Sequence, residues 1–269
     1  METNMSYHAD TARIGKSGLD LINKAPIIYW QKYLDPNRVW EDDQTPSMLL
    51  GSMSHCAVFE PAEFAKRYAV MPKIDRRTNA GKAAFEQFSA ECQAGKLTAV
   101  TMDQYEAAMR TAEAVNKHPL VRQLLDLGGW SEQRVDFTDP RTGAACKLKA
   151  DRITPSNIII DLKTTADASP EGFSKSCANY RYHVQDAWYS DGLAAASSAP
   201  VQAFIFVAVE PETGIVKPYT LDADSRALGR EQYQANLDTY LECLRTNTWP
   251  AYGDEISELR LPSWAFKSI

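Results

Sequence analysis

Residues 158–167, IIIDLKTTAD, place three isoleucines directly before Asp161, Leu162 and Lys163. A short apolar run rich in β-branched residues is typical of a buried strand. Because side chains alternate along a strand, Asp161 and Lys163 share one face, roughly 7 Å apart at their Cα atoms. On a covered face of a sheet, such charges are costly unless they are paired or bind a metal ion. The stretch therefore predicts either an ion pair at an exposed strand end or a functional site.

The residues before this stretch predict two strands that lead into it. SEQRVDFTD (131–139) and AACKLKADRI (144–153) alternate loosely and end at turn residues, which indicates an antiparallel meander. The second segment carries Asp151, which comes opposite Asp161 on the same face only if the intervening loop has an odd length. The residues TPSN (154–157) suggest a four-residue loop. A site that uses both carboxylates therefore requires a five-residue loop or a bulge.

The rest of the chain predicts one α/β domain over residues 1–269, with a mixed central sheet flanked by helices. Thr101 and Gln104 form a capping box that opens a helix to about His118. Further elements are expected at 182–196 (helix), 201–210 (buried strand), 214–221 (its hairpin partner) and 224–245 (long helix). We divide the domain into a helical part (about 1–125), a catalytic sheet core (about 126–222) and a C-terminal helix and tail (223–269).

Composition limits the class of protein. The 269 residues are 44% hydrophobic and carry a formal net charge of −6, which argues against a protein that simply coats DNA. No apolar run approaches the roughly 20 residues needed to span a membrane, and the N-terminus lacks the regions of a signal peptide. The five cysteines include no CxxC pair, so we expect buried, reduced thiols rather than disulfides or a structural zinc site. These features predict a cytoplasmic protein.

Asp151, Asp161 and Lys163 suggest metal-dependent chemistry. Two carboxylates on neighbouring strands suit a hard divalent ion such as Mg²⁺, which takes oxygen ligands and retains waters. A lysine is too basic to be a ligand, but it can orient a water or help to deprotonate it. Asp followed by Asp-x-Lys resembles the signature of the PD-(D/E)XK nucleases, here with Asp in place of the commoner Glu. The resemblance implies a restriction-endonuclease-like α/β core.

Two flanking segments strengthen this resemblance. Gly51 and His55, in GSMSHCAVFEP, resemble the G-x-x-x-H element of RecB-family nucleases. Gln185 and Tyr189, in YRYHVQDAWYSDG, resemble the Q-x-x-x-Y helix of that family and lie on one helical face. Taken alone, a single histidine or a Gln–Tyr pair is more often a packing or surface feature.

Nearly the whole chain resembles the RecE-type exodeoxyribonuclease VIII catalytic domain. Besides the segments already quoted, the resemblance rests on YHAD (7–10), RRTNAGK (76–82), TWPAY (248–252) and LPSWA (261–265). It implies a homo-oligomeric ring, a tetramer or otherwise a trimer, that digests linear double-stranded DNA from the 5′ end with Mg²⁺ and leaves 3′ single-stranded tails. It also implies a RecT-type single-strand annealing protein as partner and a phage or prophage origin. Mn²⁺ is a possible substitute ion and Ca²⁺ an inactive mimic.

The resemblance assigns roles residue by residue. Its expected metal ligands are His55, Asp151, Asp161 and the carbonyl of Leu162, with Glu132 at the edge of the site. Lys163 would act on the attacking water, and Gln185 and Tyr189 would position the scissile strand or the lysine. The expected DNA contacts are Arg76, Arg77, Lys82 and Arg181.

Several alternatives stay open. A RecB-like or restriction-type endonuclease shares the same site but would cut circular DNA, and a catalytically inactive DNA-binding module is a non-enzyme alternative. A small-molecule phosphohydrolase is less favoured, because the sequence contains no P-loop pattern. We expect no iron–sulfur cluster, because the cysteines lack the clustered spacing that it needs.

Overall fold

The centre of the protein is a mixed β-sheet. We describe it in a computed structural model that covers residues 7, 9–38 and 44–266. Within these residues the central sheet has five strands, in the spatial order β3 (Trp130–Thr138), β4 (Ala145–Ile153), β5 (Ile158–Thr164), β6 (Ala203–Val209) and β7 (Val216–Tyr219). β5 and β6 run parallel, and the other neighbours are antiparallel. The predicted meander and hairpin are therefore confirmed, as is the α/β fold with a mixed sheet.

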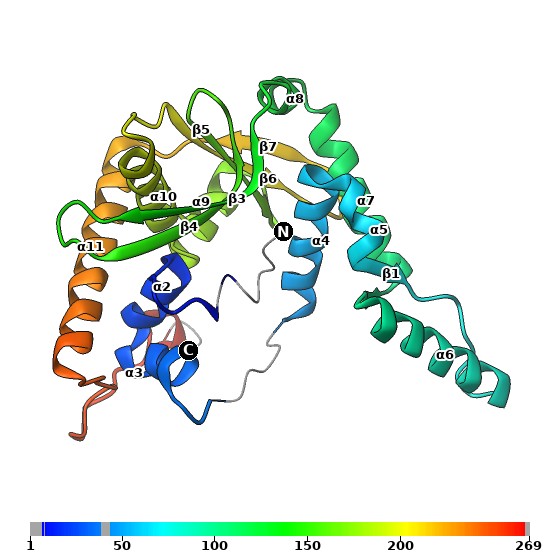
Figure 1. Ribbon diagram of the computed structural model, residues 1–269, viewed down its shortest axis with the longest axis horizontal. Coiled ribbons are helices and arrows are strands. Elements are labelled where there is room, and N and C mark those ends of the chain that lie inside the picture. Colours follow the sequence, from blue (N-terminus) through cyan, green and yellow to red (C-terminus); the bar gives the residue numbers. More distant parts are fainter. Residues whose placement is uncertain (1–6, 8, 39–43, 267–269) are drawn as a thin grey trace.

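Helices cover both faces of this sheet (Figure 1). One face carries α2 (Lys16–Lys24), α9 (Pro170–Asn179), α10 (Tyr182–Ser197) and α11 (Ala223–Thr246). The other carries α4 (Pro46–Phe59), α7 (Met102–Lys117) and α8 (Pro119–Asp126). Successive side chains of β5 point to opposite faces of the sheet, so β5 packs against both helical layers. Ile159 packs in the first core, and Ile160 and Leu162 pack in the second. α9 and α10 form the crossover that a parallel β5–β6 pair requires.

The length of the turn between β4 and β5 determines whether Asp151 and Asp161 lie on the same face of the sheet. Arg152 pairs with Ile160 and Ile153 with Ile159, and the Thr154 N–H donates to the Ile158 carbonyl at 2.9 Å. Residues 155–157 thus form a three-residue turn, in which Asn157 has a left-handed φ of 56°. The expectation of a five-residue loop or a bulge was wrong, although the odd length it required is present.

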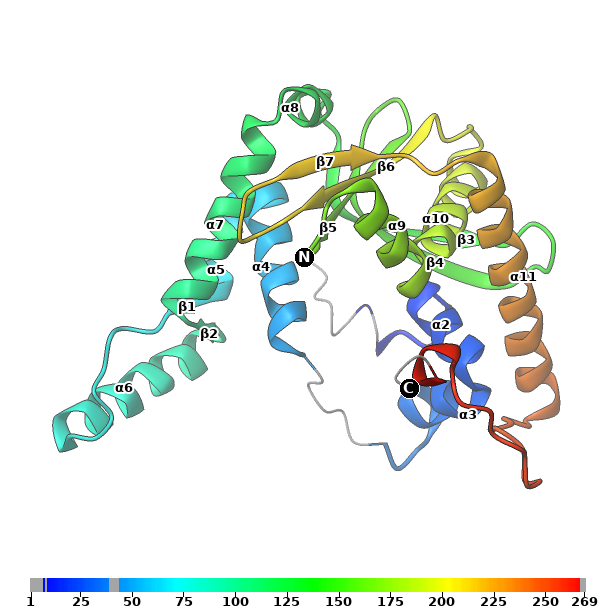
Figure 2. The ribbon, with the colours of Figure 1, turned by 180° about the vertical axis from the view of Figure 1, so that it is seen from behind.

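The helical part contains both expected and unexpected elements. The Thr101 capping box is confirmed, with the Gln104 N–H donating to the Thr101 hydroxyl at 3.2 Å. Helix α6 (Asn79–Gly95) begins inside the RRTNAGK segment, and Thr78 caps this helix. Parallel strands β1 (Tyr68–Val70) and β2 (Thr98–Val100) were not anticipated in this part. Figure 2 shows α6 extending from them as an arm away from the main body.

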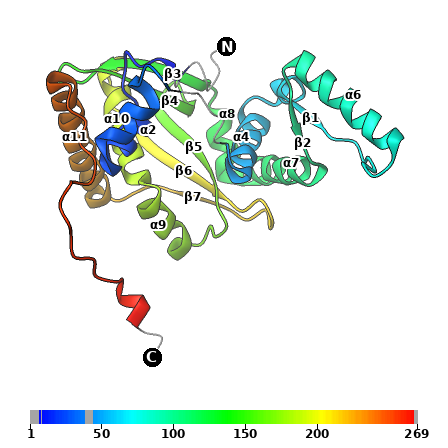
Figure 3. The ribbon, with the colours of Figure 1, turned by 90° about the horizontal axis from the view of Figure 1, so that it is seen from below.

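Short elements complete the described chain. They are α3 (Pro26–Tyr29), a π-helical turn (Trp30–Leu34), a 3₁₀ turn (Pro61–Glu63), α5 (Phe64–Arg67) and a C-terminal 3₁₀ turn (Ser263–Phe266). Figure 3 shows the C-terminal segment leaving the body as an extended tail. No helix among the described residues combines the length and apolarity that a membrane span needs. The five cysteines are all buried free thiols, so their predicted burial is confirmed.

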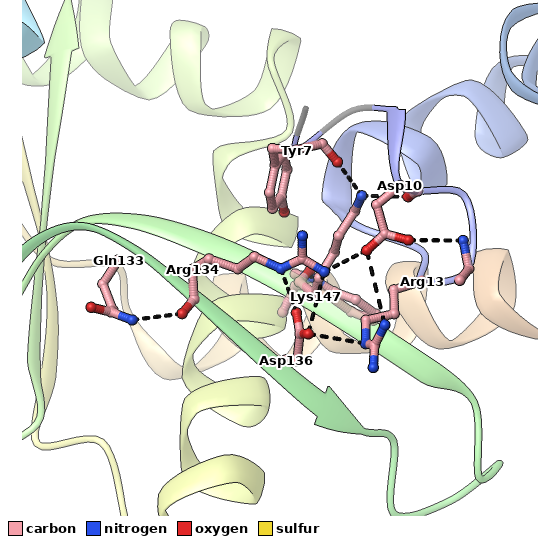
Figure 4. Close-up of polar contacts among 9 residues, drawn as sticks. Tyr7, Asp10, Arg13, Gln133, Arg134, Asp136 and Lys147 are labelled. Atoms are coloured by element: carbon pink, nitrogen blue, oxygen red, sulfur yellow. Dashed lines mark hydrogen bonds and ion pairs between the residues drawn. The ribbon is translucent and has the colours of Figure 1, made fainter. Parts of the chain in front are cut away.

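The N-terminal segment is fastened to the outer strands of the sheet. Ile14 forms a parallel bridge with Cys146 on β4, where β5 no longer pairs with β4. Figure 4 shows the buried Lys147 donating through its ammonium group to the backbone carbonyls of Tyr7 and Asp10. His8, part of the YHAD motif, lies outside the described residues. The edge of β4 is thus closed by chain from the N-terminus.

Close packing of α10 against α11 provides a first prediction. A Cβ added at Gly229 of α11 would lie 2.0 Å from the backbone oxygen of His183, which cannot rotate away. Gly229→Ala should therefore lower the free energy of unfolding by about 3 kcal/mol. Urea denaturation measures this change, provided that the dependence of the unfolding free energy on urea concentration is the same for both proteins.

A matched control for this prediction lies in α4. A Cβ at Gly51 would meet only the Thr164 hydroxyl, at 3.7 Å, which is ordinary contact. Gly51→Ala should leave stability unchanged or raise it by up to about 1 kcal/mol, because alanine favours helix more than glycine. Equal stability of the two variants would contradict the described packing.

Candidate metal and catalytic site

Three carboxylates lie side by side across three strands. The β3–β4 register pairs Ser131 with Arg152 and Gln133 with Ala150, which places Glu132 opposite Asp151. The β4–β5 register continued by one residue places Asp151 opposite Asp161. The regular pairing of β4 with β5 ends just before this point, so the strands separate where the aspartates lie. The sheet therefore opens at the row of acidic side chains.

One group of side chains has the composition of a metal site. Ligand atoms of His55, Glu132 and Asp151 all lie within 4.8 Å of one another. His55, from α4, places Nε2 at 3.5 Å from Asp151 Oδ2 and at 2.8 Å from the Leu162 carbonyl oxygen. An imidazole nitrogen, two carboxylates and a backbone carbonyl suit a divalent cation. Glu132 thus belongs to this group rather than to its edge.

The electrostatic state of Asp151 fits the same interpretation. Its carboxylate is buried and accepts a hydrogen bond from the Leu162 N–H at 2.8 Å. Burial, with a further contribution from the nearby Asp161, raises the pKa of Asp151 to about 7, although His55 opposes the shift. A bound cation would compensate for such a buried negative charge. The residues present therefore fit a divalent ion.

Asp161, which the resemblance makes a metal ligand, contacts Lys163 and Gln185 in this structure. Its Oδ1 forms an ion pair with Lys163, and its Oδ2 accepts a hydrogen bond from Gln185 Nε2 of α10 at 2.6 Å. Burial acts to lower the pKa of Lys163, but the carboxylates of Asp161 and Asp151 outweigh it and raise that pKa. Lys163 therefore stays a protonated donor beside the metal group.

Aromatic rings enclose this part of the site. The ammonium nitrogen of Lys163 lies 4.8 Å from the centre of the Tyr182 ring, a cation–π distance. Tyr189 stacks edge-on to Phe204. Its side chain is partly buried, and burial raises the pKa of the phenol well above the usual value, so it stays neutral. Gln185 and Tyr189 thus face the site from one side of α10, as their spacing predicted.

The expected DNA contacts fall into two groups. Arg76, Arg77 and Lys82 lie on or just before the α6 arm, where Arg76 covers the Phe85 ring and Arg77 pairs with Asp75 in an exposed salt bridge. Arg181 instead lies at the start of α10, and its guanidinium group bonds the Asp20 and Asn236 side chains. The structure therefore does not bring these four residues together.

Sequence reasoning missed two residues of the site. Lys149 Nζ lies 2.8 Å from Glu132 Oε2, and Tyr182 covers Lys163. A signal for Lys149 was present, because it precedes Asp151 by two residues and must share its face. No comparable pattern singled out Tyr182, which falls in the quoted YRYHVQDA segment without a role.

The fold and the grouped donors define a PD-(D/E)XK-like protein with a candidate divalent-metal site. Residues 32–262 match the family described as a PDDEXK-like domain of unknown function, DUF3799, and the chain belongs to this family. A comparison with curated proteins gives no match.

A solved structure agrees with this fold. A protein from Eubacterium rectale, provisionally described as an exonuclease, superposes with a TM-score of 0.63 at 14% identity, over 100% of this chain and 98% of that one. At this identity the likeness concerns the fold alone. SSO0001 aligns over 72% of this chain and 88% of its own with 14% identity and a TM-score of 0.29, which is too low to support an argument.

Proposed function

We propose that the chain is a Mg²⁺-dependent nuclease that digests linear double-stranded DNA from the 5′ end and leaves 3′ single-stranded tails. The observation that carries the proposal is the grouping of His55, Glu132 and Asp151 within 4.8 Å, beside the Lys163–Asp161 pair. Membership of a PDDEXK-like family supports the reaction class. The polarity and the 3′ tails rest on the resemblance to the RecE-type domain.

The residues divide the work of phosphodiester hydrolysis. His55, Asp151, Glu132 and the Leu162 carbonyl would hold the ion, which supplies charge stabilisation and an activated water. Lys163 donates hydrogen bonds to that water or to a phosphate oxygen, because its raised pKa keeps it protonated. Asp161 orients Lys163, and Gln185 fixes Asp161 through its 2.6 Å hydrogen bond.

Digestion of linear and covalently closed circular duplex DNA, with and without Mg²⁺, tests this function. We expect loss of the linear substrate only, with Mg²⁺ present, and release of label from 5′ ends before 3′ ends. Cleavage of the closed circle would instead identify the endonuclease alternative. No cleavage of either DNA, with the ion bound, would support the inactive DNA-binding alternative.

We further propose a ring-shaped homo-oligomer that threads DNA and acts with a RecT-type annealing protein. Support comes from the resemblance and from the charge distribution, since a chain of net charge −6 must segregate its cations to hold a polyanion. Light scattering should give a mass of three or four times the 30.0 kDa chain mass. A monomer that digests DNA processively would contradict the ring.

Charge reversal on the arm gives a further prediction. Arg76→Glu with Arg77→Glu should weaken DNA binding at least about ten-fold and flatten its salt dependence, because fewer phosphates are neutralised. The Arg77–Asp75 pair is exposed and contributes little, so it leaves Arg77 available to phosphate. Fluorescence anisotropy over a salt series measures both effects.

Arg245→Glu is the matched control, because Arg245 forms a similarly exposed pair with Glu242 on α11. It should bind DNA as the unmodified chain does. Equal binding by the arm variant would remove Arg76 and Arg77 from the DNA interface.

A further inference from the structure

Lys149 is a second lysine in the candidate metal site, and its surroundings differ from those of its neighbour on the strand. Lys147, Lys149 and Asp151 share one face of β4, because they alternate along it. The ammonium group of Lys147 binds two backbone carbonyls of the N-terminal segment (Figure 4). That of Lys149 instead lies 2.8 Å from Glu132 Oε2, with the two side chains only 14% and 17% exposed.

The charges of the site limit how many cations it can hold. Three carboxylates, those of Glu132, Asp151 and Asp161, lie beside two ammonium groups, those of Lys149 and Lys163, which leaves a net charge of −1. One divalent ion would bring this to +1, and a second would bring it to +3. In a poorly hydrated site, such an excess of like charge is strongly unfavourable.

Ligand availability leads to the same limit. Two of the three carboxylates are already neutralised, Glu132 by Lys149 and Asp161 by Lys163. A second ion placed about 4 Å from the first, as in two-metal sites, would need at least one of these carboxylates. Lys163 and Asp161 act together in the proposed reaction, so Asp161 is not available to a second ion. Whether a second ion binds therefore depends on the Lys149–Glu132 pair.

The backbone at Glu132 provides an independent observation. Glu132 has a left-handed φ of 50° inside β3, an uncommon conformation for a residue other than glycine, asparagine or aspartate. The regular pairing of β3 with β4 is interrupted at Glu132 and is present on both sides of it. A strained backbone conformation of this kind persists only where the surrounding structure stabilises it, and such conformations are common at functional sites. Here it accompanies a carboxylate that contacts both the metal group and Lys149.

We propose that Lys149 is a positioning residue that, through Glu132, restricts the site to a single divalent ion. Its ammonium group lies 2.8 Å from Glu132 Oε2 and therefore competes with a second ion for that oxygen. This inference rests on the proposed metal-dependent function and adds the number of ions and the residue that sets it.

Counting bound Mn²⁺ by equilibrium dialysis tests the proposal without DNA or turnover. The unmodified chain should bind one ion per site, and Lys149→Met should bind two, because the site then has a net charge of −2. Lys149→Met combined with Glu132→Gln should return to one ion. Lys149→Arg keeps the charge and should bind one, as should Lys175→Met, which changes an exposed lysine on α9.

Electron paramagnetic resonance of saturating Mn²⁺ gives a second measurement that needs no variant. The unmodified chain should give the spectrum of isolated ions, whereas a spin-coupled pair would overturn the proposal. One ion in a folded Lys149→Met variant would also overturn it. Absence of any bound ion in the unmodified chain would instead remove the proposed metal-dependent function itself, so the two failures are distinguishable.

Discussion

Lys163→Ala is expected to lower the rate of DNA cleavage by about a thousand-fold while the protein still folds and binds its ion. Removal of one preorganised donor from a transition state typically has an effect of this size. Lys163 contacts Asp161 and the Tyr182 ring but offers no lone pair to a metal while protonated, so the ion should not depend on it. Single-turnover digestion of linear duplex DNA at saturating enzyme isolates the chemical step.

Two comparisons make this result specific. Lys175→Ala removes an exposed lysine paired with Glu171 and should cleave at the normal rate. Calorimetric titration with Ca²⁺ should show that Lys163→Ala still binds the ion, because His55, Asp151 and the Leu162 carbonyl remain in place. Cleavage within ten-fold of normal would exclude Lys163 from the reaction.

Asp151→Asn should abolish cleavage and weaken ion binding, yet stabilise the metal-free protein. The buried carboxylate of Asp151 has its pKa raised from 3.8 to about 7, mainly by burial. A pKa raised on folding means that this group favours the folded state at low pH and that this contribution is lost as the pH rises through about 7. Asparagine has no such charge, and its amide oxygen can still accept the Leu162 N–H.

The sign of this effect can be measured in EDTA. At pH 8.5 the variant should exceed the unmodified chain by about 2–4 kcal/mol in the free energy of unfolding. At pH 5.5 the difference should be roughly half as large, because the penalty builds up between the unfolded pKa of 3.8 and the folded pKa of about 7. Asp254→Asn, in the exposed tail, should show no change at either pH. A difference that does not grow with pH would contradict the buried, uncompensated charge.

The parts of the fold that sequence predicts best are those with a strong periodic pattern. The alternation expected for residues 158–163 agrees with the observed packing, in which Ile159 lies in one core and Ile160 and Leu162 lie in the other. The Thr101 capping box located α7, and the helix expected at 224–245 corresponds to α11, in each case to within one residue of the observed ends. β1 and β2 were missed because three-residue strands are too short to show alternation.

The site was harder to predict because it depends on register and backbone conformation. The pairing of Asp151 with Asp161 needed the Thr154–Ile158 hydrogen bond, which shortens the turn to three residues and which no local pattern reveals. Glutamate has no preference for a left-handed backbone, so the reorientation of Glu132 toward His55 could not be foreseen. The sequence does show that Lys149 and Asp151 share one face of a strand. The contact between Lys149 and Glu132 could not be predicted, because it depends on the position of Glu132.

The most direct test of the central claim is a crystal structure of the protein soaked in Mn²⁺, with the ion located from its anomalous scattering. The account predicts an ion bound by His55, Asp151 and the Leu162 carbonyl, with metal–oxygen distances of about 2.1–2.4 Å. Glu132 or its bound waters should complete the shell on the side of Lys149. An anomalous map with no peak among these residues, at Mn²⁺ concentrations that support cleavage, would contradict the claim that they form the catalytic metal site.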